Sequence, residues 1–499
     1  MVDLRTFHQN KTAVRLGDII YLPETPERFA YTGQLDVLHQ RREQLPPELA
    51  KRLDGCTSAS LAQLIICDEV RQSAWGTAIP AWVSVLPDPF RCEAERECAI
   101  HATENPNIVL GFPFSGLGGY VIDLDSTLLG GAYCHFNLQR LAHIRQLAWL
   151  TTPVLLQDRP GVIPSRFEHN RLNHCWDVAA VANLLGHGLG LSESEIATLT
   201  LAAATHDART PAGGDTTKIL DRAFFDEDAN YPELLTTFDA ETFLRQCNVD
   251  RGTLTQTILG KETLGMLLDI ADKTSYVARD AFWFHQRMDT EITDCEEGEA
   301  IHHLLRRHPD ICNIWHDVTL AKGMPTFTDV EALSRMLMLR VLLFRALYYH
   351  PASRFTEFIV AHVVLRHLVD RGALTFRDLL MWRDDELDKR VEVFGHLVYG
   401  AHFGEPEFRG FDDEPSARRF EQQLRDDGEI CVMLETMPKR ISSGTRYRVR
   451  TRDGIVSLAE AHPDLAAPID ALAHVVTPYR VYWVPQDTLP DAIRSILRK

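Results

Sequence analysis

The segment IATLTLAAATHD, residues 196–207, is the stretch that decides the fold. Its apolar residues have the spacing of a buried helix, and Ser192-Glu-Ser-Glu195 ahead of them is typical of a capping box. The helix ends in His206 and Asp207. An imidazole nitrogen and a carboxylate oxygen suit Mn, Fe, Zn or Mg, although such a pair is common by chance. Its meaning therefore depends on its surroundings.

Two further helices carry candidate chemistry on either side of this segment. Upstream, Asn170-Arg-Leu-Asn-His174 opens a helix whose apolar face includes Val178. Downstream, residues 268–280 form a helix on which Asp272, Tyr276 and Arg279 occupy one face at i, i+4 and i+7. That face suits phosphate handling, but taken alone it better fits an internal Asp–Tyr–Arg network of an amphipathic helix.

The remaining pattern predicts a mainly α protein in three parts. Residues 1–105 are broken by prolines and form a mixed N-terminal accessory segment of unassigned role. Residues 106–435 form the helical domain, with short strands at 108–112 and 119–124. Residues 436–499 alternate as strands at 445–451 and 479–484 around a helical stretch, which indicates a small α/β C-terminal region. Within the helical domain the predicted helices include 136–147, 264–287, 331–350 and 355–369.

Composition narrows the classes of function. The formal net charge of −18 over 499 residues argues against nucleic acid and anionic lipid as partners. The basic residues of 439–452 alternate, as on one exposed face of a strand. None of the ten cysteines forms a Cys-x-x-Cys pair, which favours buried thiols in a reducing cytoplasm. Charged residues interrupt the apolar runs 336–349 and 358–369, so neither is expected to cross a membrane.

The order of the candidate ligands resembles that of the HD superfamily of metal-dependent phosphohydrolases: His174, then His206-Asp207, then Asp272. The sequence is also similar to the deoxynucleoside triphosphate triphosphohydrolase branch, which comprises SAM-and-HD-domain proteins and bacterial dGTPases. The motifs behind this likeness span roughly 119–400, and they are residues 137–147, RLNH at 171–174, DKTSYVARD at 272–280, RALYYH at 345–350 and residues 372–387.

The resemblance implies an HD-type helical core and one divalent metal ion, which would be Mn, Mg, Fe, Zn or Ni. The ion would be held by His174, His206, Asp207 and Asp272 and would activate a water that Asp207 also orients. The expected substrate is a nucleotide such as a dNTP, or another phosphorylated small molecule. Family members often assemble, so a homo-oligomer is expected.

The candidate phosphate and nucleotide contacts are Arg171, Lys218, Lys273, Tyr276, Arg340, Arg345 and Tyr348. Other roles stay open for several of them. Arg340 and Arg345 could extend from a buried helix with their charged ends in water. Tyr348 or Tyr349 could stack on a base or sugar, or simply pack in the core.

Two features depart from the family pattern. Arg166-Phe-Glu-His169 is a second string of the family type, so His169 is the alternative first ligand to His174. The run after His206-Asp207 has Thr210 and Asp215 at the positions of the family's catalytic histidines, and Lys218 at its glutamate. Asp215 is the candidate general acid if burial raises its pKa, or else a turn residue. This departure leaves open a phosphatase or phosphodiesterase acting on another ester, and a non-catalytic nucleotide sensor.

Overall fold

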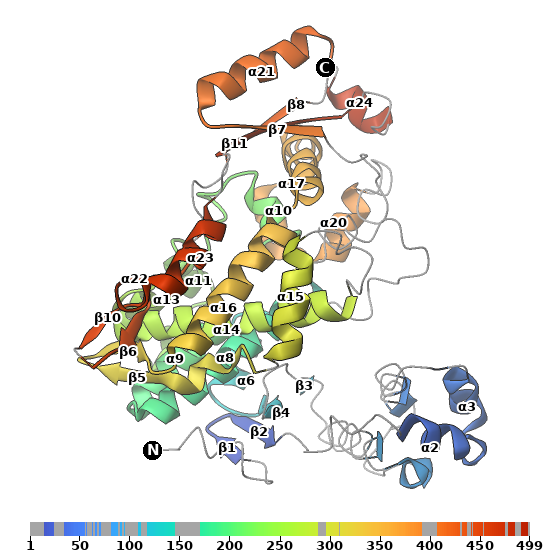
Figure 1. The fold of residues 1–499 in the computed structure, drawn as a ribbon, viewed down its shortest axis with the longest axis vertical. Coiled ribbons are helices and arrows are strands. Elements are labelled where there is room, and N and C mark those ends of the chain that lie inside the picture. The colour runs from blue at the N-terminus through green and yellow to red at the C-terminus, as the bar shows by residue number, and fades with distance from the viewer. Residues whose placement is uncertain are drawn as a thin grey trace. The chain divides into compact units, whose positions relative to one another are not determined.

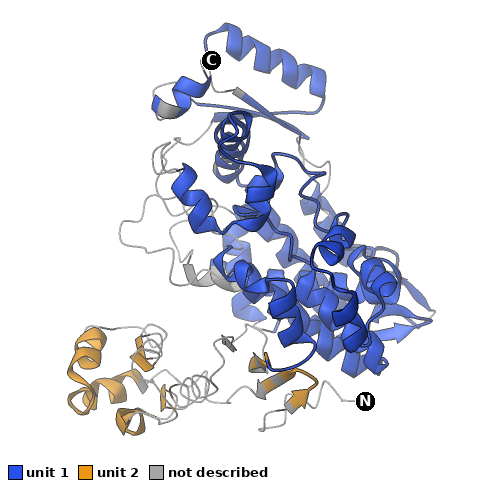
Figure 2. Ribbon diagram, turned by 180° about the vertical axis from the view of Figure 1, so that it is seen from behind, with its two compact units in different colours: residues 1–4, 125–499 blue, residues 5–124 orange. Residues whose placement is uncertain are grey.

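The computed structural model describes residues 14–23, 34–54, 81–87, 108–110, 117–144, 170–287, 296–308, 310–391, 407–429, 432–436, 443–452, 454–474, 478–484 and 491–497, with isolated positions at 56, 62, 65–66, 69–70, 90–91, 94 and 441. The chain divides into two compact units (Figure 2). Residues 5–124 form the N-terminal unit, and residues 1–4 with 125–499 form the helical unit.

The N-terminal unit combines a small sheet with a helical cluster. The antiparallel sheet has the order β1 (Val14–Leu16), β2 (Ile19–Pro23), β4 (Leu117–Ile122) and β3 (Ile108–Leu110). The cluster contains α2 (Gln34–Gln40), η2 (Arg42–Gln44), α3 (Pro47–Leu53) and η3 (Ala81–Val85). Leu49, Leu53 and Val83 are fully buried there, so this unit has an apolar core of its own.

The centre of the helical unit is formed by three helices that pack against one another: α8 (Arg171–Leu189), α9 (Glu193–Thr205) and α14 (Glu262–Arg287) (Figure 1). Sequence signals explain where they begin. The Asn170 side chain accepts a hydrogen bond from Asn173 N at 2.9 Å and caps α8. Ser192 and Glu195 form the predicted capping box at the start of α9.

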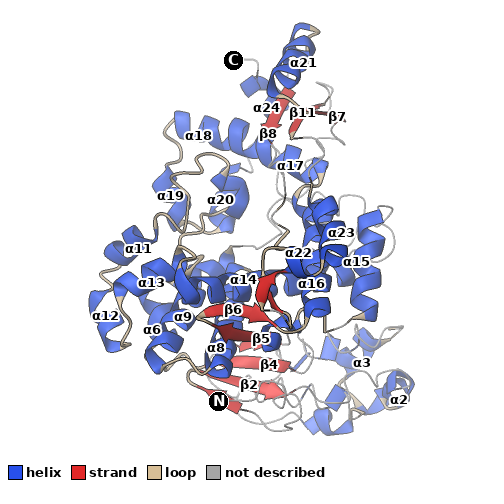
Figure 3. Cartoon of the chain, turned by 60° about the vertical axis from the view of Figure 1, so that its left-hand side comes forward, coloured by secondary structure: helices blue, strands red, loops and turns tan. Residues whose placement is uncertain are grey.

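Further helices lie around this centre, drawn in blue like every helix in Figure 3. Before α14 they are α6 (Leu129–His135), η4 (Leu138–His143), α10 (Gly214–Lys218), α11 (Tyr231–Thr237), α12 (Glu241–Gln246) and α13 (Arg251–Ile258). After it come α15 (Glu296–Arg307), η6 (Asn313–Asp317), α16 (Val330–Leu343), η7 (Phe344–Tyr348), α17 (Pro351–Phe358), η8 (Ile359–Leu365), α18 (Arg366–Asp370), α19 (Phe376–Met381) and α20 (Asp384–Val391).

Two small sheets complete the helical unit. One has the order β10 (Ile455–Ser457), β9 (Arg448–Arg450), β6 (Met324–Phe327) and β5 (Val318–Ala321). The other has the order β7 (Glu407–Phe411), β11 (Tyr479–Trp483) and β8 (Val432–Thr436). The helices of this C-terminal part are α21 (Glu414–Asp426), α22 (Leu458–Ala461), α23 (Pro463–Ala473) and α24 (Asp491–Leu497). None of the helices in the described part of the chain is long and apolar enough to cross a bilayer.

The prediction of a mainly α fold with a small α/β appendage is confirmed. On β9 the predicted alternation is also found, with Val449 buried between exposed Arg448 and Arg450. The boundaries at 105 and 435 remain predictions. The chain's contacts divide it near residue 124, and strands β9 and β11 pair with β6, β7 and β8, of which β8 spans residue 435.

The local structure differs from the general helical pattern in three places. Residues 318–327 form a hairpin rather than helix, because Lys322 and Gly323 adopt the positive φ angles of a tight turn. The helix predicted at 136–147 is the short 3-10 segment η4 within its described part. The helices predicted at 331–350 and 355–369 each change to π-helical hydrogen bonding, in η7 and η8.

Candidate metal centre

His206 and Asp207 lie where α9 ends and the chain turns away. The Nδ1 atom of His206 is 2.8 Å from the carbonyl oxygen of Ala203, so Nδ1 carries the proton that is donated to this carbonyl. The Nε2 atom of His206 then keeps its lone pair for another partner. This arrangement, with one ring nitrogen fixed by a backbone carbonyl, is the usual orientation of a metal-binding imidazole.

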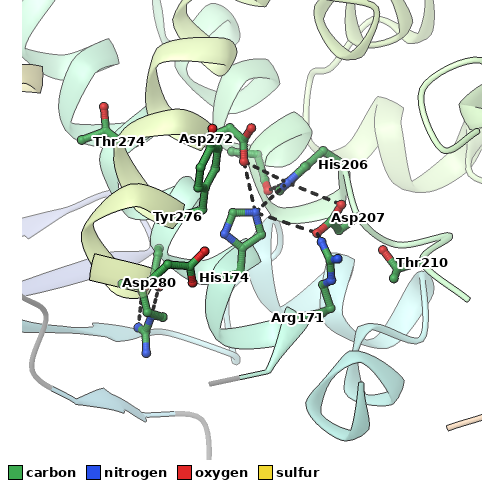
Figure 4. Close-up of polar contacts among 12 residues, drawn as sticks. Arg171, His174, His206, Asp207, Thr210, Asp272, Thr274, Tyr276 and Asp280 are labelled. Carbon is green, nitrogen blue, oxygen red and sulfur yellow. Dashed lines mark hydrogen bonds and ion pairs between the residues drawn. The ribbon is translucent and has the colours of Figure 1, made fainter. Parts of the chain in front are cut away.

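His174 faces His206 from the first turns of α8. It is only 3% exposed, and its Nε2 atom is 3.2 Å from His206 Nε2. Asp272, on α14, places Oδ1 3.1 Å from His174 Nε2 and 3.7 Å from His206 Nε2. Both imidazoles also lie 3.8 Å from oxygens of Asp207. The fold thus brings together the four predicted ligands from three separate helices (Figure 4).

The spacing of these donor atoms fits a divalent metal ion. Ligands bound about 2.1 Å from one ion lie roughly 3.0–3.5 Å from their neighbours, and the distances here run from 3.1 to 3.8 Å. His174, His206 and Asp207 each offer one atom within 4.8 Å of the others. Two neutral imidazoles with carboxylates form a mixed donor set that first-row metals accept. The cluster could therefore hold a metal ion.

The electrostatics of the cluster favour ionised carboxylates. Burial opposes ionisation of Asp207, but Arg171 and the two histidines outweigh it and hold the pKa of Asp207 far below its ordinary value. The pKa of Asp272 is also lowered, because a hydrogen bond from His174 outweighs burial. The same contact raises the pKa of His174 against the effect of its burial.

A charged network extends from Asp207. Arg171, 5% exposed, donates from Nη1 to Asp207 Oδ2 at 2.8 Å and from Nη2 to Asp215 Oδ2 at 2.9 Å. Lys218 Nζ lies 3.0 Å from Asp215 Oδ1 and 2.7 Å from Glu227 Oε2. Glu227 also accepts a hydrogen bond from the hydroxyl of Thr210. Two predicted phosphate contacts, Arg171 and Lys218, thus lie beside the cluster.

Asp215 does not meet the condition set for a general acid. Loss of hydration raises its pKa, but Lys218 and Arg171 outweigh this effect, and the pKa lies well below its ordinary value. Its side chain is 64% exposed. An ionised carboxylate between two cations has no proton to donate at neutral pH. The general-acid prediction for Asp215 therefore lacks the raised pKa on which it depended.

The other predicted phosphate and nucleotide contacts have partners within the protein. Tyr276 follows Asp272 by one helical turn, and its hydroxyl accepts from Arg340 Nε at 2.5 Å. The hydroxyl of Tyr348, in η7, donates to Asp280, which lies on α14 together with Tyr276. Lys273 instead pairs with Asp269 at 2.7 Å.

Arg345 lies in a different environment, where Nε is 2.9 Å from Glu297 and Nη1 donates to the carbonyl of Leu472. Arg279, on α14, is paired with Asp177, on α8, at 2.6 Å, so this ion pair joins two helices and is not the Asp272–Tyr276–Arg279 network within one helix that the sequence left open. His169 lies outside the described residues.

Sequence reasoning assigned no role to three residues near the cluster. Arg140, 7% exposed, donates to the carbonyl oxygens of Ala208 and Thr210 at 3.1 and 2.7 Å and so holds the turn after Asp207. The sequence offered one signal for Arg140, since it is an arginine among apolar residues that repeat at spacings of three and four. Glu227 and Asp228 had none, because only the tertiary fold brings them near. Dehydration raises the pKa of Asp228 to about 6, although His206 lowers it.

No protein-family model matches the sequence, and no curated protein matches it. Among solved structures, a hypothetical protein from Aquifex aeolicus is similar over 78% of this chain and 100% of its own, with a TM-score of 0.54 and 16% identity. A phosphohydrolase from Bacteroides thetaiotaomicron is similar over 76% of this chain and 99% of its own, with a TM-score of 0.53 and 17% identity. The chain therefore shares its fold with a phosphohydrolase.

Proposed function

We propose that the protein is a metal-dependent phosphohydrolase of the HD type whose substrate is a nucleotide such as a dNTP. The observation that carries this proposal is the meeting of His174, His206, Asp207 and Asp272, with donor atoms 3.1 to 3.8 Å apart. The fold shared with a phosphohydrolase supports it. When bound there, a divalent ion would supply an activated water and offset charge on the phosphoryl oxygens.

The chain's own residues would position the phosphates and manage protons. Arg171 and Lys218 each form an ion pair with Asp215, whose side chain is largely exposed. A phosphate group that approaches the cluster could replace Asp215 as their partner and accept bidentate hydrogen bonds from Arg171. Asp207, kept ionised by Arg171, would orient the attacking water.

Proton donation to the leaving group needs a carboxyl that retains its proton near neutrality. Asp228, with a pKa of about 6 and within electrostatic reach of His206, suits this role better than Asp215 does. Tyr276, Arg340 and Tyr348 provide two partly buried phenols and a buried guanidinium for the sugar and base.

The test compares the full-length protein with the double variant His206→Ala/Asp207→Ala, each incubated with Mn or Mg and a panel of nucleotides. We expect the wild type to release tripolyphosphate from at least one dNTP, and the double variant to lose both metal binding and hydrolysis. Asp385→Asn, on the exposed face of α20, is the control for a carboxylate change far from the cluster in sequence. Hydrolysis that survives in the double variant would contradict the mechanism.

Hydrolysis of a different phosphate ester is the second candidate function. Thr210, Asp215 and Lys218 stand where a triphosphohydrolase is expected to have other residues. Together with Glu227 they form a network of ion pairs and one hydrogen bond. The same assay separates these functions. Orthophosphate from a monoester would indicate a phosphatase, and cleavage of a diester would indicate a phosphodiesterase. Nucleotide binding without turnover would indicate a sensor.

A further inference from the structure

A cavity of about 380 Å³ lies in the C-terminal part of the helical unit. Its walls are the end of α17, the π-helical segment η8, strand β8 and helices α21 and α24, the elements drawn around the C-terminal sheet in Figure 1. No residue of the metal cluster or of the charged network around Arg171 lines it. The volume lies within the range of about 300–1,000 Å³ that is common for small-molecule sites.

The floor of the cavity is apolar. Ile359 and Val363 come from η8, Leu434 from β8 and Leu497 from α24. A π-helix is rare, and where it occurs it is frequently found at a functional site. Here the π-helical segment η8 forms one wall of the cavity, so the rare backbone geometry lies at the proposed binding site.

Cations line the mouth. Arg418, Glu421 and Arg425 are spaced by three and four residues on α21 and so share the face that lines the cavity. The two guanidinium groups stand against two carboxylates, Glu421 in the lining and Glu414 beside it, so binding of an anion depends on exchange of these ion pairs. His362 adds no charge at neutral pH, because burial and Arg366 lower its pKa.

The guanidinium groups can change partners at low cost. Arg418 pairs with Glu414 at 2.6 Å and Arg425 with Glu421 at 2.9 Å, both across one helical turn, and their side chains are 64% and 44% exposed. Exposed pairs of this kind contribute little to stability, because water screens them. A carboxylate above an apolar floor would form stronger, bidentate contacts.

Two of the walls are fixed against each other. Arg354, on α17, donates to Glu435, on β8, at 2.8 Å and to Glu357 at 2.6 Å. Glu435 is 2% exposed and accepts a second hydrogen bond from Tyr482, on β11, at 2.8 Å. Since this network joins α17 to the sheet, the cavity is formed before a ligand arrives, which reduces the cost of binding.

We propose that this cavity binds a small amphipathic monoanion, a carboxylate with a hydrocarbon body of roughly ten carbons. Its head lies between Arg418 and Arg425, and its body lies against Ile359, Val363 and Leu434. The two guanidinium groups bind the head, and the apolar side chains bind the body. This site is independent of the proposed hydrolysis.

The test is isothermal titration calorimetry of the full-length protein with decanoate below its micellar concentration. We expect one site per chain. Decanol, which lacks the charge, and acetate, which lacks the body, should bind at least about tenfold more weakly, as expected for loss of a charged hydrogen-bonding head or of the buried chain. Decyl phosphate tests the head group, and tighter binding of it than of decanoate would overturn the choice of a carboxylate.

Matched variants locate the site. Arg418→Gln/Arg425→Gln should weaken decanoate about tenfold or more and leave decanol unchanged. Thr436→Phe, at an exposed position that lines the cavity, should weaken both probes by filling it. Arg419→Gln lies on the same helix but does not line the cavity, and it should change nothing. Equal effects of the arginine double variant and Arg419→Gln, or no binding of decanoate by the wild type, would overturn the proposal.

Discussion

Arg171 is the side chain on which the charge balance of the cluster depends. It is 5% exposed and holds the equally buried Asp207 at 2.8 Å. We predict that Arg171→Ala, measured by urea unfolding in EDTA, lowers the free energy of unfolding by about 3–5 kcal/mol, because it leaves a buried carboxylate without its partner. Added Mn should recover part of this loss, since the ion would offset the charge of Asp207.

Arg335→Ala is the control for this prediction. Arg335 pairs with Glu331 at 3.2 Å across one turn of α16, and the glutamate side chain is 77% exposed. Its loss should cost less than about 1 kcal/mol. Similar costs for the two alanine variants, or no response of Arg171→Ala to Mn, would show that Asp207 does not depend on Arg171.

Glu357 should give the protein a pH-dependent stability. Burial raises its pKa to about 7, although Arg354 lowers it, and the side chain is 11% exposed. Between the ordinary pKa near 4.5 and about 7, the folded protein holds a proton that the unfolded chain has released. Stability therefore falls as pH rises through this window, by up to about 3 kcal/mol at about 1.4 kcal/mol per pKa unit.

Glu357→Gln should remove this contribution, because an amide keeps the shape of the side chain and leaves Arg354 paired with Glu435 alone. Urea unfolding at pH 5, 6, 7 and 8 measures the slope. The variant should match the wild type at pH 5 and exceed it at pH 8. A slope that is identical in both proteins would contradict the assignment, and Glu331→Gln on an exposed helix face controls for the change of net charge.

The sequence singled out the four candidate ligands because each lies in a local pattern, at a helix start, a helix end or a charged helix face, and because their order resembles that of the HD superfamily. The surroundings of these residues could not. Asp215 follows two glycines in the sequence, yet the fold places it between Arg171 and Lys218, which reverses the expected direction of its pKa. Glu227 reaches Lys218 only through the tertiary path of the chain.

At the scale of elements, apolar periodicity and capping residues predicted α9 and α14 closely. Periodicity reports which residues face the core, and this pattern is nearly the same for α-helical and π-helical turns. The change to π geometry at Phe344 and at Ile359 was therefore invisible in the sequence. The 318–327 hairpin was missed because its strands are only four residues each.

The cap of α8 connects helix stability to the cluster. Asn170 accepts from Asn173 N and directly precedes Arg171, one turn before His174. We predict that Asn170→Ala lowers stability by about 1 kcal/mol and also weakens Mn binding, because the first turn that carries both side chains becomes less ordered.

Ser192→Ala is the matched control at the start of α9, where the serine hydroxyl accepts from Glu195 N at 3.3 Å. It should cost a similar amount, about 1 kcal/mol, and leave Mn binding intact, because His206 lies at the far end of that helix. Thermal melts with and without Mn measure both effects. Equal Mn binding in the two variants would show that the cap of α8 does not order the cluster.

At the scale of the whole molecule, the sequence indicated a mixed N-terminal part and a helical body, but the partners of the strands were beyond its reach. β6 pairs with β9 across more than a hundred residues, and β11 inserts between β7 and β8. Such pairings depend on which edges the folded helices leave available, and no short motif encodes them.

The two units should therefore unfold separately. The four candidate ligands all belong to the helical unit, so differential scanning calorimetry of the full chain should show two transitions, of which Mn raises only one. Leu49 and Leu333 are fully buried, one in each unit. Leu49→Ala should lower the temperature of the Mn-insensitive transition only, and Leu333→Ala that of the Mn-sensitive transition only. Each variant should reduce the free energy of unfolding of its own unit by about 2–5 kcal/mol. If the units unfold independently, a substitution in one core shifts only the transition of that unit. A single transition that Mn and both variants shift together would therefore mean that the two units unfold as one cooperative body.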